Sequence, residues 1–175
     1  IGPGSFTGLR ISMATAKAIA QVRNLPIIAV NSLESLAFNM NLCDKIICPI
    51  LDAQRNQVYT GKYKFENGEF KTIEDIKVIE IESLIEELSN KDEDFILVGE
   101  ATILYKEKLE PVENIYVASA SNNVSKASSL CAIGAMKYHK DMDVYNCYTV
   151  NPMYIRKSQA EVQYDEKMKR LENDK

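Results

Sequence analysis

Apolar and polar residues along the chain follow a helical period in some segments and an alternating period in others. Helix-forming residues fill positions 7–23, and the apolar run 26–30 that follows indicates a short buried strand. A second helix is expected over about 32–40, where Asn31 or Ser32 can cap its first turn and the apolar side chains fall on one face. The first forty residues therefore predict a helix–strand–helix unit.

The rest of the chain continues to alternate between strands and helices. A buried strand at 46–51 precedes the alternating stretch 57–65, and Asn67-Gly68 predicts a hairpin turn to a partner strand at 70–79. Further elements are expected at 81–88 (helix), 95–98 (buried strand), 101–109 (short helix) and 123–139 (longer helix). This order indicates an α/β protein with a mixed sheet.

A change of composition at residues 39–45 divides the chain into parts. We expect residues 1–43 to form a front piece with two helices and a strand, and residues 44–157 to form a larger back lobe. Residues 158–175 read as a charged tail. The chain begins with isoleucine and runs directly into a Gly-Pro-Gly turn, which favours the later part of a longer protein.

The first predicted helix is apolar on two sides. One side carries Leu9, Met13, Ala16 and Ala20, and a broad opposite arc carries Ile11, Thr15, Ala18, Ile19 and Val22. A polar stripe contains Arg10, Lys17 and Gln21. Such a helix must be covered on two sides, either by two parts of its own chain or by its own sheet and a second polypeptide. We favour the second polypeptide.

The glycines before this helix do not match a known phosphate-binding motif. A Walker loop would need Lys followed by Ser or Thr, and Gly2, Gly4 and Gly8 give G-x-G-x-x-x-G, one residue longer than the dinucleotide fingerprint. Free N–H groups at the helix start could still contact an anion, through Ser5, Phe6, Thr7 and Gly8. The alternative, which spacing alone favours, is that the glycines supply unusual backbone angles and Ser5 or Thr7 caps the helix.

Composition narrows the classes of function. A net charge of -4 disfavours a chain that grips nucleic acid alone, and the longest apolar runs are far shorter than a membrane span. The four cysteines show no C-x-x-C spacing and His139 is the only histidine, so neither a metal nor a cofactor is expected. Scattered thiols suit a reducing compartment, and we expect a cytoplasmic protein.

Few other residues suggest chemistry. His139 reads as a solvated residue at a helix end, and Cys48 as inert packing inside a strand. The carboxylates between residues 74 and 87 read as a solvated face. Asp52 ends a buried strand, where it could act chemically, but a turn-stabilising pair with Arg55 is favoured.

The opening block GPGSFTGLRISMATAKAIA resembles the signature of the bacterial TsaB/YeaZ family. The resemblance continues in VNSLESLA (30–37), LDAQRNQVY (51–59), VGEA (98–101) and PMYIRKSQAE (152–161), and so extends over nearly the whole chain. It implies a ribonuclease-H-like fold, of the actin and Hsp70 type, from which the first part of the N-terminal lobe is missing. It also implies a non-catalytic subunit needed for threonylcarbamoyl transfer to tRNA adenosine. Within the late motif, Tyr154, Arg156 and Glu161 would pack back on the fold or help assembly.

The catalytic sister of this family carries two metal-binding histidines four residues apart on the second helix. Ser32 and Leu36 stand at the matching positions here, and leucine cannot ligate a metal. The resemblance therefore implies a relative that has lost the catalytic chemistry. An ATP-binding phosphotransferase of the actin-like class remains the alternative, and a peptidase is the least favoured.

The resemblance further implies that the first two helices pair with those of the catalytic sister, or with a second copy when the sister is absent. An ATPase subunit would join the same complex, tRNA would be met only through the complex, and no membrane would be involved. The expected partner interface comprises Leu9, Arg10, Met13, Ala16, Lys17, Ala20, Leu33, Leu36 and Ala37.

Overall fold

A five-stranded mixed sheet forms the centre of the molecule in the computed structural model, which describes residues 1–156, 164 and 168. Its spatial order is β4-β3-β2-β5-β6. The strands are β2 (Ile46–Asp52), β3 (Gln57–Glu66), β4 (Glu69–Glu80), β5 (Phe95–Val98) and β6 (Ile115–Val117). β2, β3 and β4 pair antiparallel, whereas β5 and β6 run parallel to β2. The predicted α/β class with a mixed sheet is confirmed.

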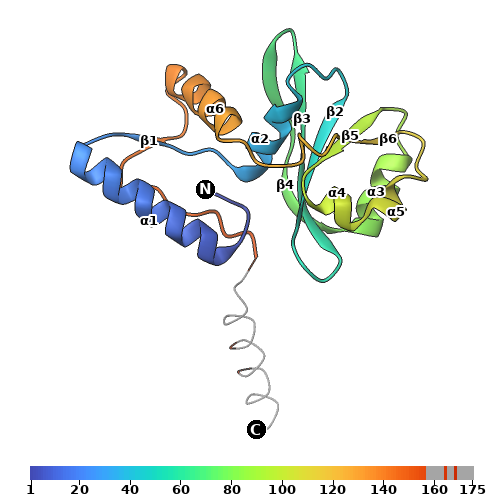
Figure 1. Ribbon diagram of the computed structural model, residues 1–175, viewed down its shortest axis with the longest axis horizontal. Coiled ribbons are helices and arrows are strands. Elements are labelled where there is room, and N and C mark those ends of the chain that lie inside the picture. Colours follow the sequence, from blue (N-terminus) through green and yellow to red (C-terminus); the bar gives the residue numbers. More distant parts are fainter. Residues whose placement is uncertain (157–163, 165–167, 169–175) are drawn as a thin grey trace.

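Helices cover both faces of this sheet (Figure 1). One face packs against α3 (Ile81–Ser89), α4 (Ala101–Leu104) and α5 (Lys106–Leu109), and the other against α2 (Ser32–Ala37). The helix α6 (Ala127–His139) lies against α2 and the short 3-10 helix η1 (Phe38–Met40). Along β2, Ile46, Cys48 and Ile50 point into the first core while Ile47 points into the second, as strand alternation requires.

Two glycine-containing turns fix the sheet. Asn67 and Gly68 both have positive φ values, 53° and 81°. The backbone twist of such a turn matches the twist of the paired strands, so the predicted tight hairpin between β3 and β4 is present. Gly99 follows β5 with φ of 121°, and a Cβ at this position would lie 2.3 Å from the carbonyl oxygen of Ile50. Only glycine allows the chain to leave β5 this close to β2.

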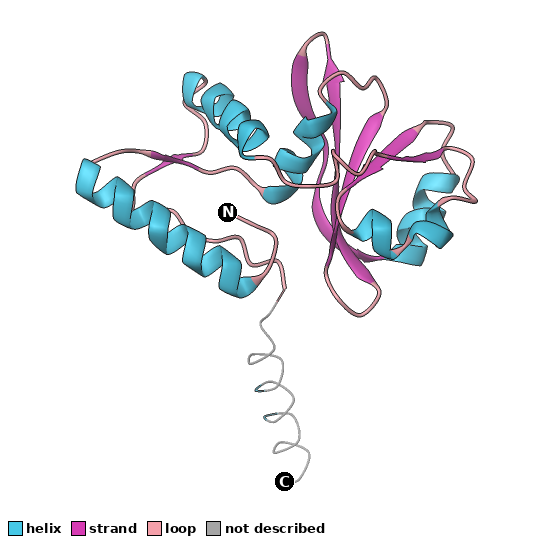
Figure 2. Ribbon diagram, in the orientation of Figure 1, coloured by secondary structure: helices cyan, strands magenta, loops and turns pink. Residues whose placement is uncertain are grey.

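The front of the molecule contains α1 (Phe6–Arg23), which lies apart from the sheet (Figure 2). β1 (Ile27–Ile28) follows it and pairs antiparallel with β7 (Val144–Tyr145) in a separate two-stranded ribbon. The strand expected at 26–30 is therefore shorter than predicted, and Ile27 and Ile28 are only half-buried. Partnership with β7, far away in sequence, was not expected.

The boundary expected between residues 43 and 44 does not separate two cores. Leu33 and Leu36 of α2 lie in the same cluster as Ile47 of β2 and Tyr63 of β3. The second helix therefore belongs with the sheet, because its apolar face has the sheet to bury against. The helix expected at 101–109 is divided at Tyr105, and the helix expected at 123–139 begins only at Ala127. Nearly all of the predicted tail, 158–175, lies outside the described residues.

Candidate partner interface

α1 presents one large apolar flank to solvent. Ile11, Ile19 and Val22 are 64%, 57% and 84% exposed, and they fall on one side of the helix together with the exposed Thr15 and Ala18. We call these five residues the outer flank. Helical positions with this period normally face a core, so their exposure is the most unusual surface feature of the helix.

The opposite side of α1 packs against its own chain. Leu9 and Met13 are half-buried and Ala20 is buried. Gly2, with φ of 108°, lies so close that a Cβ there would be 3.0 Å from Leu9 Cδ1 and 3.0 Å from the carbonyl oxygen of Met153. Part of the interface expected on this side is therefore occupied by the chain itself. Of the other expected residues on α1, Arg10 and Ala16 are exposed and Lys17 is half-buried.

The polar stripe of α1 contacts the segment 148–154. The Nε of Arg10 donates a hydrogen bond to the Tyr154 hydroxyl at 3.1 Å, and the Tyr154 ring stacks on Phe6 with centroids 4.9 Å apart. Near the other end of the helix, Gln21 donates to the Tyr148 hydroxyl at 3.4 Å. Tyr154 thus packs back on the fold, one of the two roles expected for the late motif. Sequence reasoning did not find Tyr148, because nothing in the local pattern places it beside a helix more than a hundred residues away.

Ser5 caps the start of α1. Its Oγ accepts the Gly8 N–H at 3.5 Å, and its carbonyl accepts the Leu9 N–H at 2.9 Å. The backbone angle at Gly2 and this cap are what the architectural interpretation of the opening glycines requires. Contact between an anion and Ser5, Phe6, Thr7 or Gly8 stays a prediction.

The α2 residues of the expected interface require a correction. Leu33, Leu36 and Ala37 are 0%, 1% and 0% exposed and pack against the sheet. Their side chains are not available to a partner while this packing persists. Apolar residues at helical spacing indicate a buried face, but they do not say which surface buries it.

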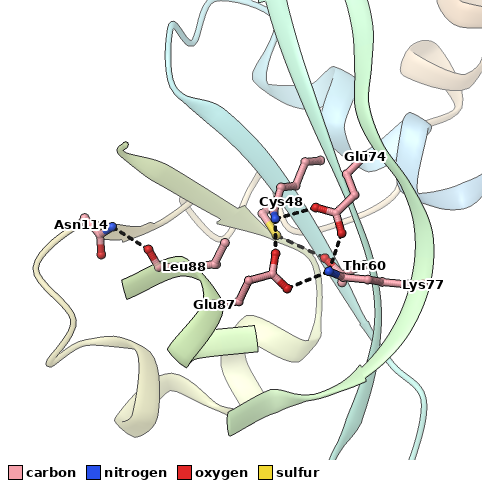
Figure 3. A network of polar contacts seen from close by, with 8 residues as sticks. Cys48, Thr60, Glu74, Lys77, Glu87, Leu88 and Asn114 are labelled. Carbon is pink, nitrogen blue, oxygen red and sulfur yellow. Dashed lines mark hydrogen bonds and ion pairs between the residues drawn. The ribbon is translucent and has the colours of Figure 1, made fainter. Parts of the chain in front are cut away.

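A ring of ion pairs lies on the opposite face of the sheet from α2 (Figure 3). Lys62 of β3 is nearly buried and pairs with Glu74 of β4 at 2.6 Å and with Glu87 of α3. Lys77 pairs with the same two carboxylates, at 2.7 Å for Glu87. Burial acts to raise the pKa of Glu74 and Glu87, but the hydrogen bonds from both lysines outweigh it and lower both pKa values. These two carboxylates are therefore not part of a purely solvated face.

Beside this ring, Cys48 is fully buried, with its Sγ 3.2 Å from the Thr60 hydroxyl. Burial raises the pKa of the Cys48 thiol to about 11, so the thiol stays protonated and inert, as expected. At the end of α3, the side-chain amide of Asn114 donates to the carbonyl of Leu88 at 2.9 Å, which caps the helix. None of these contacts leaves a free nucleophile or base.

The other candidate residues have structural positions. The Asp52 carboxylate accepts the Gln54 N–H at 2.8 Å, so it stabilises the turn, but no ion pair joins it to Arg55 in the described part of the chain. His139 is exposed at the end of α6. Across residues 1–156, 164 and 168, no cluster of three His, Cys, Asp or Glu side chains could hold a metal ion. No described helix is long and apolar enough to cross a bilayer.

Comparisons with known proteins show the family of the chain. A family model described as "TsaD: tRNA N6-adenosine threonylcarbamoyltransferase" matches residues 1–164. The "tRNA threonylcarbamoyladenosine biosynthesis protein TsaB" of Bacillus subtilis (strain 168) is 34% identical over 96% of this chain and 72% of its own length. The protein of the same name from Escherichia coli (strain K12) is 32% identical over 56% of this chain and 44% of its own length.

Solved structures show the same fold. A structure titled "YeaZ from Pseudomonas aeruginosa" superposes with a TM-score of 0.71 at 22% identity, over 87% of this chain and 71% of that one. A second Pseudomonas aeruginosa structure, described as similar to peptidase YEAZ, gives a TM-score of 0.71 at 21% identity, over 89% of this chain and 70% of that one. The ribonuclease-H-like fold implied by the sequence resemblance is confirmed.

Proposed function

The chain belongs to the TsaD/TsaB family, and from this premise we propose that it is a non-catalytic subunit of the cytoplasmic machinery that forms threonylcarbamoyladenosine on tRNA. Its role would be to dock on the catalytic sister subunit and activate threonylcarbamoyl transfer. The relatives named TsaB support the pathway. The residues of α1 support docking, and the residues of α2 support a role without catalysis.

The positions on α2 favour a non-catalytic role. Leu36, at one of the positions where the resemblance implies a metal-binding histidine in the sister, is buried against the sheet. Its hydrocarbon side chain offers no ligand atom, and Ser32 at the other position is a poor replacement for an imidazole. Transfer chemistry that needs a metal at this helix would therefore be carried out by the partner.

The outer flank of α1 is the observation that carries the docking proposal. Exposing Ile11, Ile19 and Val22 forfeits the roughly 1.5–3 kcal/mol that burial of each such side chain contributes. A second polypeptide, or the part of the N-terminal lobe that the family resemblance implies ahead of residue 1, would restore it, and the docking proposal takes the second polypeptide. α1 also carries three basic residues, Arg10, Lys17 and Arg23, and no acidic one. A matching surface would have an apolar centre with carboxylates at its rim.

The test compares two exposed apolar positions in the full-length protein. Val22→Glu places a charge in the outer flank, whereas Leu42→Glu changes a side chain that is 97% exposed beyond η1. Co-purification with the catalytic sister should fall at least roughly tenfold for Val22→Glu, because a carboxylate would be desolvated in the interface, and should not change for Leu42→Glu.

Circular dichroism of each variant completes the experiment. Retained fold with lost binding supports docking. Normal binding by folded Val22→Glu contradicts it, and so does unfolding of Val22→Glu alone, because the flank would then pack against another part of the same chain. Measuring ATP hydrolysis by the isolated protein separates the proposal from the phosphotransferase alternative, since a scaffold should show no turnover without its partner.

A further inference from the structure

The ribbon that carries α1 is too short to hold a helix in place by itself. It contains the pairs Ile27–Tyr145 and Ile28–Val144, extended by one hydrogen bond from the Ala29 N–H to the Asp143 carbonyl at 2.9 Å. An isolated two-stranded ribbon is marginal in water even when its strands are longer. Something else must fix its direction relative to the sheet.

A single lysine of α6 contacts Ala29 and Asp143, the residues that lie next to β1 and β7 and extend the ribbon by one hydrogen bond. The Nζ of Lys137 donates to the Ala29 carbonyl at 3.2 Å and pairs with the Asp143 carboxylate at 2.8 Å. The same ammonium pairs with Glu34 of α2 at 2.8 Å. An ammonium has three donors, and these three partners use all of them.

The contact with Glu34 ties the ribbon to the core of the sheet. Glu34 also accepts the Asn31 N–H at 3.1 Å, while the Asn31 side chain accepts the Glu34 N–H at 2.7 Å, so the carboxylate is held in the capping box of α2. The neighbouring Leu33 and Leu36 anchor α2 in the sheet core. A rigid acceptor thus connects through Lys137 to the residues next to β1, which follows α1, and next to β7, which pairs with β1.

Lys137 is held as a charged group. Its side chain is 14% exposed, and the side chain of Glu34 is 12% exposed. Burial acts to lower the pKa of Lys137, but the hydrogen bonds to Asp143 and Glu34 outweigh this effect and raise the pKa. Loss of the Lys137 ammonium would remove the ion-pair partner of Glu34 in a largely buried place, where a weakly compensated charge is costly.

We propose that Lys137 is a positioning residue that sets the direction of α1 relative to the sheet, and so presents the outer flank for docking. The docking part of this inference rests on the proposed function. Lys137 acts through Ala29, Asp143 and Glu34, and it does not itself form part of the outer flank. The same contacts would be expected to hold the ribbon whether or not a partner is bound.

The experiment compares Lys137→Met with Lys62→Met in the full-length protein. Both variants remove a largely buried, doubly ion-paired lysine, but Lys62 lies in the β3–β4–α3 ring and not near the ribbon. Hydrogen exchange is measured at a temperature at which both variants are folded, with the Ala29 amide as the reporter of the ribbon. Lys137→Met should speed exchange at Ala29 about tenfold or more relative to the β2 and β5 amides, whereas Lys62→Met should not change that ratio.

Affinity for the catalytic sister is the second readout. It should fall for Lys137→Met by roughly tenfold, recover in Lys137→Arg, which keeps the charge, and stay at the wild-type value for folded Lys62→Met. Equal acceleration of exchange over the whole chain would overturn the inference, and so would a loosened ribbon with unchanged affinity. The exchange measurement uses no partner, so a wild-type protein that binds no partner would refute the docking proposal without touching the positioning result.

Discussion

Replacing Lys62 gives the most specific prediction about stability, because the structure shows which charged groups remain when its ammonium is removed. Only 4% of its side chain is exposed, and its two carboxylate partners, Glu74 and Glu87, are 32% and 28% exposed. Lys62→Met replaces the ammonium by an apolar side chain of similar length and leaves both carboxylates with Lys77 alone. Removing one member of a buried pair costs about 3–5 kcal/mol. Partial hydration of the carboxylates and the remaining Lys77 place the expected loss at about 3 kcal/mol, the low end of that range.

Urea denaturation at pH 7 measures this loss against a matched exposed pair. Lys106 and Glu110 lie 3.4 Å apart with side chains 65% and 59% exposed, so Lys106→Met should cost less than about 1 kcal/mol. A free energy of unfolding for Lys62→Met that equals that of Lys106→Met would refute the reasoning. It would mean that water reaches the ring and screens its charges.

The dependence of folding stability on pH provides an independent check on the ring of ion pairs. Because the folded-state pKa values of Glu74 and Glu87 are lowered, their stabilising contribution is present above the unfolded value of about 4.3 and is lost as pH falls through the folded values. Removing Lys62 weakens that lowering. The stability gap between wild type and Lys62→Met should therefore narrow between pH 5 and pH 3. A gap that stays constant on acidification would show that the ring does not titrate as described.

Three further outcomes are expected. Gly99→Ala should destabilise the fold by roughly 2 kcal/mol or more in urea denaturation, because the residue has φ of 121° and its new Cβ would meet the backbone of β2 at 2.3 Å. Restoring both histidines of the sister in Ser32→His/Leu36→His should cost about 2–5 kcal/mol and yield no zinc binding by calorimetry, since the second side chain points into the core. In the native protein at pH 8, a maleimide should label the exposed Cys131 and spare Cys48, and mass spectrometry of the peptides reports both.

Local patterns in the sequence were sufficient to predict most of the sheet and its flanking helices. The Asn67-Gly68 turn was predicted because its two residues accept positive φ, and α3 was predicted because its apolar residues recur at helical spacing. Both features depend only on residues close together in sequence. The β1–β7 ribbon was missed for the opposite reason, since two-residue strands have no period to detect.

The ion-pair ring shows why a site can escape sequence analysis. Continuing the register set by the hairpin turn from the pair Tyr63–Thr72 would place Lys62 opposite Ile73. A bulge shifts the register, so that Lys62 faces Glu74 instead. Gly61 lies at this point, and a Cβ there would be 3.2 Å from the Glu74 carbonyl oxygen. Glycine within a strand is the local signal of a bulge, but it does not give the new partner.

The outer flank is the proposed docking surface because contacts within the chain already hold the other sides of α1. Gly2 packs between Leu9 and the Met153 carbonyl on one side, and Tyr154 and Tyr148 accept hydrogen bonds along the polar stripe. The ribbon that follows the helix is bound by Lys137. A helix held in this way has little freedom to turn its remaining flank inward, so the exposure of that flank follows from the contacts on the other sides. Docking there would bury apolar surface without reorganising these contacts, and a preorganised surface binds with less entropic cost than a flexible one.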